Sequence, residues 1–316
     1  MKKLYYLFIL AYCVPAALVS ISCAGSGEKV DLKLSLEQGK TYKLRTINDI
    51  KMTQTFQGHE MEMSQKMTFD FTFEVQTVGD GGDVTMKVTY HSVAVEMGGP
   101  MGKVEYDSAN PTETEHPMVK GFAALAGQSY TMVVSTTGEV KKVEGMKEIM
   151  DRMIESLDLP EEQRKEAIRG QFENMFGDQA AVEMMGQMFV MFPDRPVGVG
   201  DSWSKTITMT KGMPMTVEHD WTLKERKDGV AVLAAESVIK SNPDAGPIDM
   251  GPMKITIDIA GEQSGTVELD ESTGWVVGGR MTYRVSGDQK IEGGPAEEAS
   301  ETIPLSMEAT ITWEHF

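Results

Sequence analysis

Methionine is the side chain whose number and spacing first suggest chemistry in this sequence. The chain has 25 methionines, and the pairs Met61/Met63 and Met213/Met215 have the Met-x-Met spacing of thioether sites for soft metals such as Cu(I). Apolar and polar residues alternate around both pairs. Met61 and Met63 therefore share a face with Phe69, and their sulfur atoms are expected to point into the core. We predict no metal site.

Histidine and serine do not form a pattern that indicates catalysis. The five histidines lack metal-binding spacing, and the string at His59 is not the His-Glu-x-x-His of zinc proteases. No Gly-x-Ser-x-Gly nucleophile elbow occurs. His219 lies between Val217 and Trp221 on an apolar face, which is typical of a hydrogen-bonded core histidine. The sequence therefore predicts a protein that is not an enzyme and that carries no cofactor.

Charge and composition exclude two classes of partner. The 316 residues include 30 Lys and Arg against 48 Asp and Glu, a formal net charge of -18, and 41% of them are hydrophobic. This is the composition of a folded protein. The acidity argues against nucleic acid, because binding to phosphates requires a basic surface. It also argues against electrostatic attachment to anionic lipid.

The first residues have the features of a targeting segment. Lys2 and Lys3 precede an apolar stretch over residues 4–19, and Ser20-Ile21-Ser22-Cys23 follows. Cys13 and Cys23 are the two cysteines of the chain, so cleavage before Cys23 leaves one cysteine, at the new N-terminus. An unpaired cysteine in an exported protein is a redox liability unless it is modified.

This N-terminus resembles a bacterial lipoprotein signal, in which cleavage precedes a cysteine that receives a diacylglycerol. The resemblance implies a signal peptide over residues 1–22, a lipid anchor on Cys23 and a flexible tether over residues 23–29. An ordinary secreted protein and an uncleaved anchor are the alternatives. The expected location is outside the cytoplasm, on a bacterial outer or plasma membrane.

Strict alternation from Val30 onward predicts antiparallel strands with one apolar and one polar face. Residues 61–76 and 302–314 are clear examples, and Asp228-Gly229 and Thr273-Gly274 are hairpin turn signals. The ranges 98–117, 242–252 and 286–300 are predicted to be loops.

Residues 145–191 interrupt this alternation with a helical period. Apolar residues recur every three or four positions after Met146, and Asp158 and Asp178 are placed to cap a second and a third helix, the third extending through Phe189. The expected fold is α+β, mainly β. It has two curved, half-barrel or barrel-like antiparallel β lobes, over residues 30–144 and 192–316, joined by a three-helix block over 145–191.

A Pro-rich turn over residues 192–196 precedes Gly200-Asp201-Ser202-Trp203, which opens a strand. This arrangement resembles an uncharacterised family of exported bacterial lipoproteins with a central helical block. The resemblance implies no known activity.

The predicted function is that of a membrane-tethered envelope lipoprotein that holds a lipid-like or other apolar molecule between sheet and helices. Long sheets curl, and an apolar inner face then either fills with side chains or encloses a ligand. The alternative is a structural or interaction scaffold with a filled core. The residues predicted to line the ligand site are Met146, Met150, Met153, Phe172, Phe176, Met185, Phe189, Trp203 and Trp221.

Overall fold

The computed structural model describes residues 28–56, 58–100, 102–111, 117–157, 169–170, 177–211, 214–242, 244–250, 253–293 and 300–316. Most of these residues are in strands. The strands are β1 (Thr41–Phe56), β2 (His59–Val78), β3 (Val84–Gly99), β4 (Gly102–Asp107), β5 (Ser129–Val134), β6 (Val140–Glu144), β7 (Ser202–Thr208), β8 (Met215–Lys227), β9 (Val230–Ser241), β10 (Ile248–Met250), β11 (Met253–Asp270), β12 (Val276–Gly293) and β13 (Ser300–Glu314). The helices are α1 (Pro117–Ala123), α2 (Met146–Ser156) and α4 (Asp178–Gly186).

The thirteen strands found in the described ranges all belong to one antiparallel sheet. Its order is β6-β5-β3-β2-β1-β13-β12-β11-β9-β8-β7, with β4 added to β3 and β10 to β11. The prediction of two β lobes joined by a three-helix block was therefore wrong. The two halves of the chain are joined by β1 and β13, which pair from Arg45↔Glu314 to Gln54↔Leu305. Backbone hydrogen bonds between the first and last strands make one surface out of the two expected lobes.

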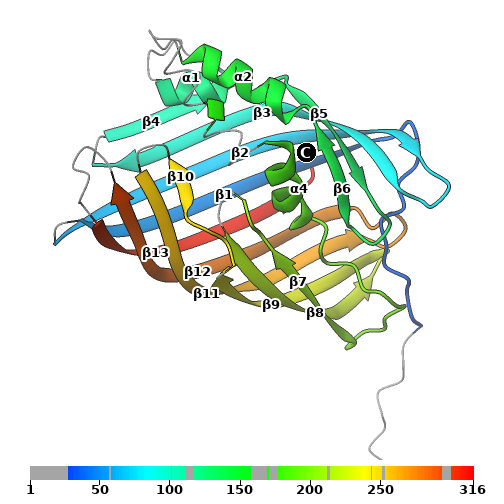
Figure 1. Cartoon of the computed structure of the whole chain (residues 1–316). Helices are drawn as coiled ribbons and strands as arrows, with labels where there is room; N and C mark the ends of the chain where they lie inside the picture. The colour runs from blue at the N-terminus through cyan, green and yellow to red at the C-terminus, as the bar shows by residue number, and fades with distance from the viewer. Residues whose placement is uncertain are drawn as a thin grey trace, which may run out of the picture.

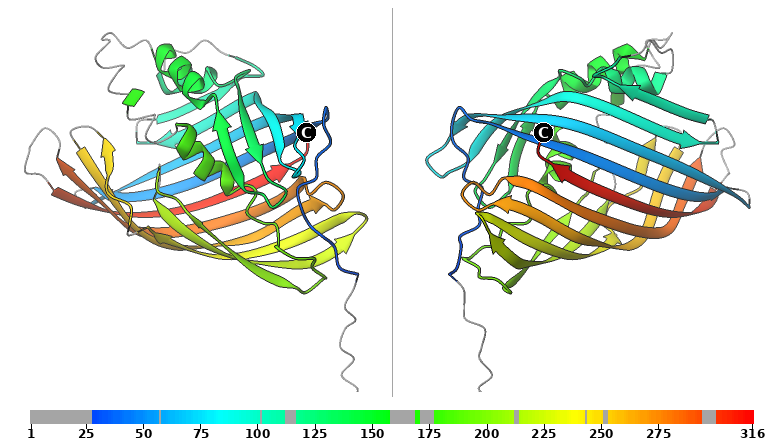
Figure 2. Two further views of the ribbon diagram at one scale, coloured as in Figure 1. Left: turned by 45° about the vertical axis from the view of Figure 1, so that its right-hand side comes forward. Right: turned by 180° about the vertical axis from the view of Figure 1, so that it is seen from behind.

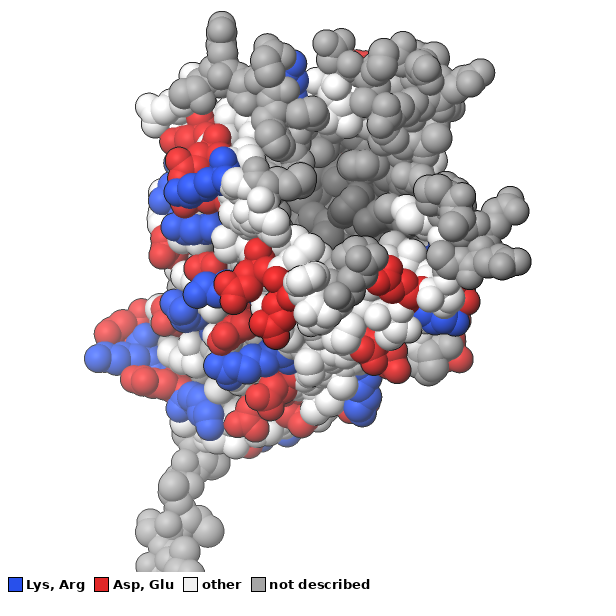
Figure 3. Space-filling model, turned by 90° about the vertical axis from the view of Figure 1, so that its left-hand side faces the viewer, with Lys and Arg blue, Asp and Glu red and all other residues white. Residues whose placement is uncertain are grey.

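The sheet is curled, with a concave face toward the helices, and no helix in the described part of the chain lies on the convex face (Figures 1 and 2). Alternation along the strands explains the two faces: Phe71, Phe73 and Val75 of β2 are buried, whereas Glu74 and Gln76 between and after them are exposed. Lys and Arg are intermixed with Asp and Glu on the side of the molecule that Figure 3 shows.

Glycine allows two neighbouring strands of the sheet to approach each other closely. Gly265 of β11 has φ +156°, and a Cβ atom there would collide with the backbone carbonyl oxygen of Arg280 on β12. A residue with a side chain would push the two strands apart. Glycine at this position therefore allows β11 and β12 to pair without a steric clash.

One end of the concave face is closed by chain segments that precede and follow the helices. The backbone N–H groups of Leu34 and Ser35 donate to the carbonyl oxygens of Thr136 and Thr273, which belong to two different turns. Phe192, 1% exposed, packs between the same two turns. We call this the closed end.

The helices lie on the concave side and do not form the expected block. α2 begins at Met146 as predicted, and α4 ends at Gly186, before Met188 and Phe189, which lie in turns. Most of the second expected helix, and Asp158, lie outside the described residues. Two expected loops contain the short elements β4 and β10, and β12 extends through Gly293 into the third. No helix in the described ranges is long and apolar enough to cross a membrane.

Candidate ligand cavity

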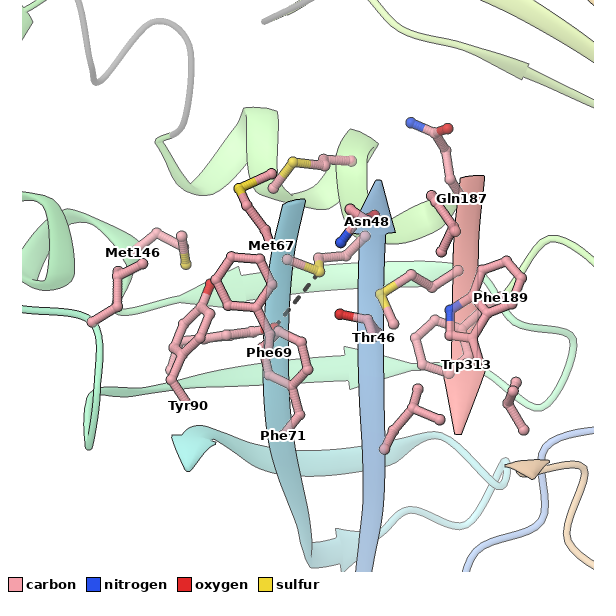
Figure 4. A pocket seen from close by; sticks show the side chains of 18 of the residues that line it. Thr46, Asn48, Met67, Phe69, Phe71, Tyr90, Met146, Gln187, Phe189 and Trp313 are labelled. Atoms are coloured by element: carbon pink, nitrogen blue, oxygen red, sulfur yellow. Dashed lines mark hydrogen bonds between the residues drawn. The ribbon is translucent and has the colours of Figure 1, made fainter. Parts of the chain in front are cut away.

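The concave face forms one wall of a cavity of about 940 Å³. Side chains along a strand point alternately to the two faces of the sheet, so residues two positions apart lie on the same face. Such residues on adjacent strands build this wall. Figure 4 shows Phe69, Phe71 and Tyr90 gathered on one side and Thr46 and Trp313 on the other. The strand residues that line the cavity are Leu44, Thr46, Asn48, Gln65, Met67, Phe69, Phe71, Phe73, Tyr90, Met97, Tyr130, His219, Trp221, Gln263, Val267, Val276, Met281, Tyr283, Ile311 and Trp313.

The opposite wall is formed by the helices and the segments that follow them. α2 presents Met146, Ile149, Met150, Met153 and Ile154, one amphipathic face with three- and four-residue spacing. The remaining residues on this wall come from α1, from α4 and from the segments that follow the three helices, and are Gly121, Phe122, Leu125, Leu157, Met184, Met185, Gln187, Met188, Phe189 and Met191.

Two carboxylates fix α4 in place over the sheet. The Oδ1 atom of Asp178 accepts a hydrogen bond from the backbone N–H of Met146 at 3.1 Å, so the first turn of α4 holds the first turn of α2. Sequence analysis had expected Asp178 to cap its own helix, but Gly177 is at that position. The Glu183 carboxylate accepts from the backbone N–H groups of Thr210 and Lys211 at 2.7 and 3.0 Å, which ties α4 to the segment after β7.

No Lys, Arg, Asp or Glu is among the described residues that line the cavity. The groups there that can titrate are one histidine and three tyrosines, and burial favours the neutral form of each. Burial raises the pKa of Tyr90 and of Tyr283 to about 12 and that of Tyr130 well above its usual value. Burial lowers the pKa of His219 to about 4. The lining is therefore uncharged at neutral pH.

Two buried nitrogen atoms of this lining have no hydrogen-bond partner among the residues that the structure describes. The Nε2 atom of His219 and the Nε1 atom of Trp221 are both unpaired, although the Nδ1 atom of His219 lies 2.8 Å from the Ser237 hydroxyl oxygen. The two residues are 4% and 3% exposed. A buried polar group without a partner is uncommon in folded proteins. These atoms therefore mark one polar part of a largely apolar cavity, whose lining also includes Thr46, Asn48, Gln65 and Gln187.

The structure brings six of the nine sequence-predicted lining residues to the cavity: Met146, Met150, Met153, Met185, Phe189 and Trp221. Trp203 is on the edge strand β7, next to Trp221, and its Nε1–H donates to the Met191 carbonyl oxygen at 3.0 Å. It is not among the lining residues. Phe172 and Phe176 lie outside the described residues, as does the predicted anchor Cys23.

Sequence analysis missed the aromatic residues of the first strands. Phe69, Phe71 and Tyr90 line the cavity, and the alternation had already placed Phe69 and Phe71 on the apolar face. That pattern identifies a buried face but not which part of it lies beneath a helix. Over the described residues, no group of three or more His, Cys, Asp or Glu could hold a metal ion. Met213 is outside those residues.

Comparison with known families identifies relatives of the chain. Residues 81–276, from just before β3 to the start of β12, match the model of a family of unknown function (DUF6263). The chain belongs to this family. The DUF6263 match contains every described helix. It also contains strands β3 to β11, which come from both halves of the sheet. No curated protein matches the chain.

Solved structures show only distant likeness. A structure titled "Lipid-protein interactions in lipovitellin" is 9% identical, with a TM-score of 0.45, and the match covers 89% of this chain and 25% of that one. The chain thus spans about a quarter of that protein's length. The translocator domain of the autotransporter NalP from Neisseria meningitidis is 7% identical, with a TM-score of 0.23 and coverage of 90% and 91%.

Proposed function

We propose that this chain is a non-enzymatic protein that binds a lipid-like, apolar molecule between the concave sheet face and the helices. The observation that carries the proposal is the cavity of about 940 Å³ lined by apolar side chains. Small-molecule sites typically have volumes of a few hundred to about 1,000 Å³ and are mostly apolar with a few polar groups. This cavity has those properties.

The methionines of the lining support an apolar ligand of variable shape. Ten lining residues are methionines, and six of them come from α2, α4 and the turn that follows α4, up to Met188. Methionine is unbranched and polarizable, so it adapts to irregular apolar surfaces. The uncharged lining also favours binding over acid–base catalysis, which needs a titratable group near the working pH.

We also propose that the protein is exported and tethered to an outer or plasma membrane through a lipid on Cys23. The support is the lipoprotein-like sequence of residues 1–23. One acyl chain gives only marginal membrane binding, so the anchor would carry several. Incorporation of radiolabelled palmitate should be lost in Cys23→Ala. Incorporation that survives this substitution would contradict the tether.

Ligand binding is tested by native mass spectrometry and lipid extraction of the full chain purified in detergent. We expect co-purified apolar adducts on the wild type. Met67→Glu places a carboxylate in the cavity and should reduce the adducts by about 100-fold or more, because an unpaired buried charge is costly. Thr68→Glu is the matched control, since Thr68 is the next residue of β2 and points to the other face.

The outcomes separate the two functions considered. Adducts that are lost in Met67→Glu and kept in Thr68→Glu support the cavity as the ligand site. Repeated spectra without adducts on the folded wild type contradict the proposal and favour a scaffold with a filled core. Circular dichroism of each variant establishes that the sheet has formed.

A further inference from the structure

A row of neutral polar side chains crosses the concave face on four adjacent strands. It consists of His219 on β8, Ser237 on β9, Gln263 on β11 and Tyr283 on β12, and we call it the polar row. The strand register places these residues directly opposite one another: His219 with Ser237, Ser237 with Gln263, and Gln263 with Tyr283. His219, Gln263 and Tyr283 also line the cavity.

The polar row lies between two apolar regions. Two residues farther along each strand, toward the closed end, the face carries Trp221, Ala235, Gly265 and Met281. Two residues in the other direction, Val217, Ile239 and Val285 belong to a separate apolar cluster. A molecule with its apolar part toward the closed end would therefore bring its polar end to this row.

His219 and Trp221 supply unused hydrogen-bonding atoms at this position. Their rings are 5.8 Å apart and inclined by 26°, and both side chains line the cavity. Trp221 Nε1–H can only donate. His219 Nε2 donates if the Ser237 hydroxyl donates to Nδ1, and accepts if Nδ1–H donates to that hydroxyl. A carbonyl oxygen can accept from both nitrogens, and a hydroxyl group can accept from Trp221 while it donates to His219.

The absence of charge among the described lining residues restricts the ligand further. A carboxylate or phosphate in this cavity would be removed from water without an opposite charge beside it. The low pKa of His219, which burial causes, keeps its imidazole neutral at neutral pH, so it does not compensate an anion. An uncharged oxygen-bearing group meets no such cost.

We propose that the polar row and Trp221 bind the ester or hydroxyl group of an uncharged lipid whose hydrocarbon chain lies in the cavity toward the closed end. This inference rests on the proposed function, because it assigns the polar end of the same ligand. It excludes free fatty acids and phospholipids as the preferred ligands.

Four probes of equal chain length test the assignment: octadecane, stearyl alcohol, methyl stearate and stearate. Each is offered at neutral pH to the delipidated full chain in detergent, and bound probe is measured by mass spectrometry. We expect the alcohol or the ester to bind about tenfold more tightly than the hydrocarbon, as one or two net hydrogen bonds would provide. The carboxylate should be the weakest of the oxygen-bearing probes.

Three substitutions remove hydrogen bonding and keep similar volume: Trp221→Phe, His219→Phe and Gln263→Leu. Trp221→Phe and His219→Phe should each abolish most of the preference for alcohol or ester over hydrocarbon, while hydrocarbon binding is kept. Gln263→Leu tests the row if either of the other two fails to fold. Glu218→Gln is the matched control, since Glu218 is an exposed neighbour of His219 on the other face of β8.

The results distinguish this inference from the proposed function. Equal binding of hydrocarbon, alcohol and ester to the wild type overturns the headgroup assignment and leaves the apolar cavity standing. Tightest binding of stearate also overturns it. Failure of all four probes to bind the folded wild type contradicts the proposed function itself.

Discussion

His219 links the chemistry of the cavity to the stability of the fold. His219 is 4% exposed and shares a hydrogen bond with Ser237, and its burial keeps the imidazole neutral in the folded chain. Burial lowers its pKa from 6.5 to about 4. In the unfolded chain the same side chain is in water and binds a proton at a higher pH.

This difference predicts a loss of stability in mild acid. As the pH falls from about 6.5 to about 4, the unfolded chain takes up a proton that the folded chain does not, so the free energy of unfolding decreases, by as much as about 3 kcal/mol. The neighbouring Gln263 does not titrate, and Tyr283, with a pKa of about 12, stays neutral in this range. Urea unfolding at several pH values measures the slope.

The control for this prediction is the same measurement on a chain that lacks this histidine. His219→Gln should flatten the slope between these pH values, because the glutamine that replaces the buried imidazole does not titrate. An identical slope in the wild type and His219→Gln would show that His219 does not cause the acid sensitivity.

At the level of elements, the position of the segment after α4 depends on Gly138 in the β5–β6 turn, because the two are in close contact. Gly138 has φ +83°, and a Cβ atom there would collide with the backbone carbonyl oxygen of Phe189 and lie 2.8 Å from the Phe192 ring. Phe189 lines the cavity and Phe192 packs at the closed end. The turn therefore sets how closely this segment approaches the sheet.

Gly138→Ala should lower the free energy of unfolding by about 2 kcal/mol or more, because the new methyl group displaces Phe189 and the φ angle is strained. It should also weaken ligand binding. Gly186→Ala is the control: it lies at the end of α4 with open space around it, and alanine favours a helix by up to about 1 kcal/mol. Equal stability of the two variants in urea would contradict this account.

Local sequence patterns predicted individual strands and helices better than they predicted which strands pair in the sheet. The alternation around Phe69 placed that residue on the inner face, and the period after Met146 predicted α2. The polar row was not recognised, because His219 looks like an ordinary core histidine until Gln263 and Tyr283 are known to be its neighbours across the sheet. Trp203 was wrongly predicted to line the cavity for the same reason, because the alternation of apolar and polar residues does not show that β7 is an edge strand.

At the scale of the whole molecule, one sheet replaces the two lobes that the helical interruption had suggested. Nothing in the local sequence shows that residues near Arg45 pair with residues near Glu314. Register between distant strands is decided by which apolar faces must be buried together, so it is a property of the complete chain. This pairing makes the concave face continuous from Tyr90 to Trp221.

The continuous sheet predicts a single cooperative unfolding transition. Trp203 and Trp221 lie toward one end of the sheet, and Trp275 and Trp313 lie nearer its middle. Tryptophan fluorescence and far-UV circular dichroism should therefore give coincident urea transitions. Two separated transitions would indicate that the halves unfold independently. Deletion of residues 300–316 should abolish the native signal of both probes, since β13 lies between β1 and β12.

β13 lies in the middle of the sheet, between β1 and β12, and this position affects folding during synthesis. β13 is synthesised after all the other described strands, yet β1 and β12 both need it to complete their backbone hydrogen bonding. Until it arrives, two long strand edges in the middle of the molecule remain open to other chains. Synthesis therefore leaves a period in which a chaperone that shields unpaired strands would protect this chain from aggregation.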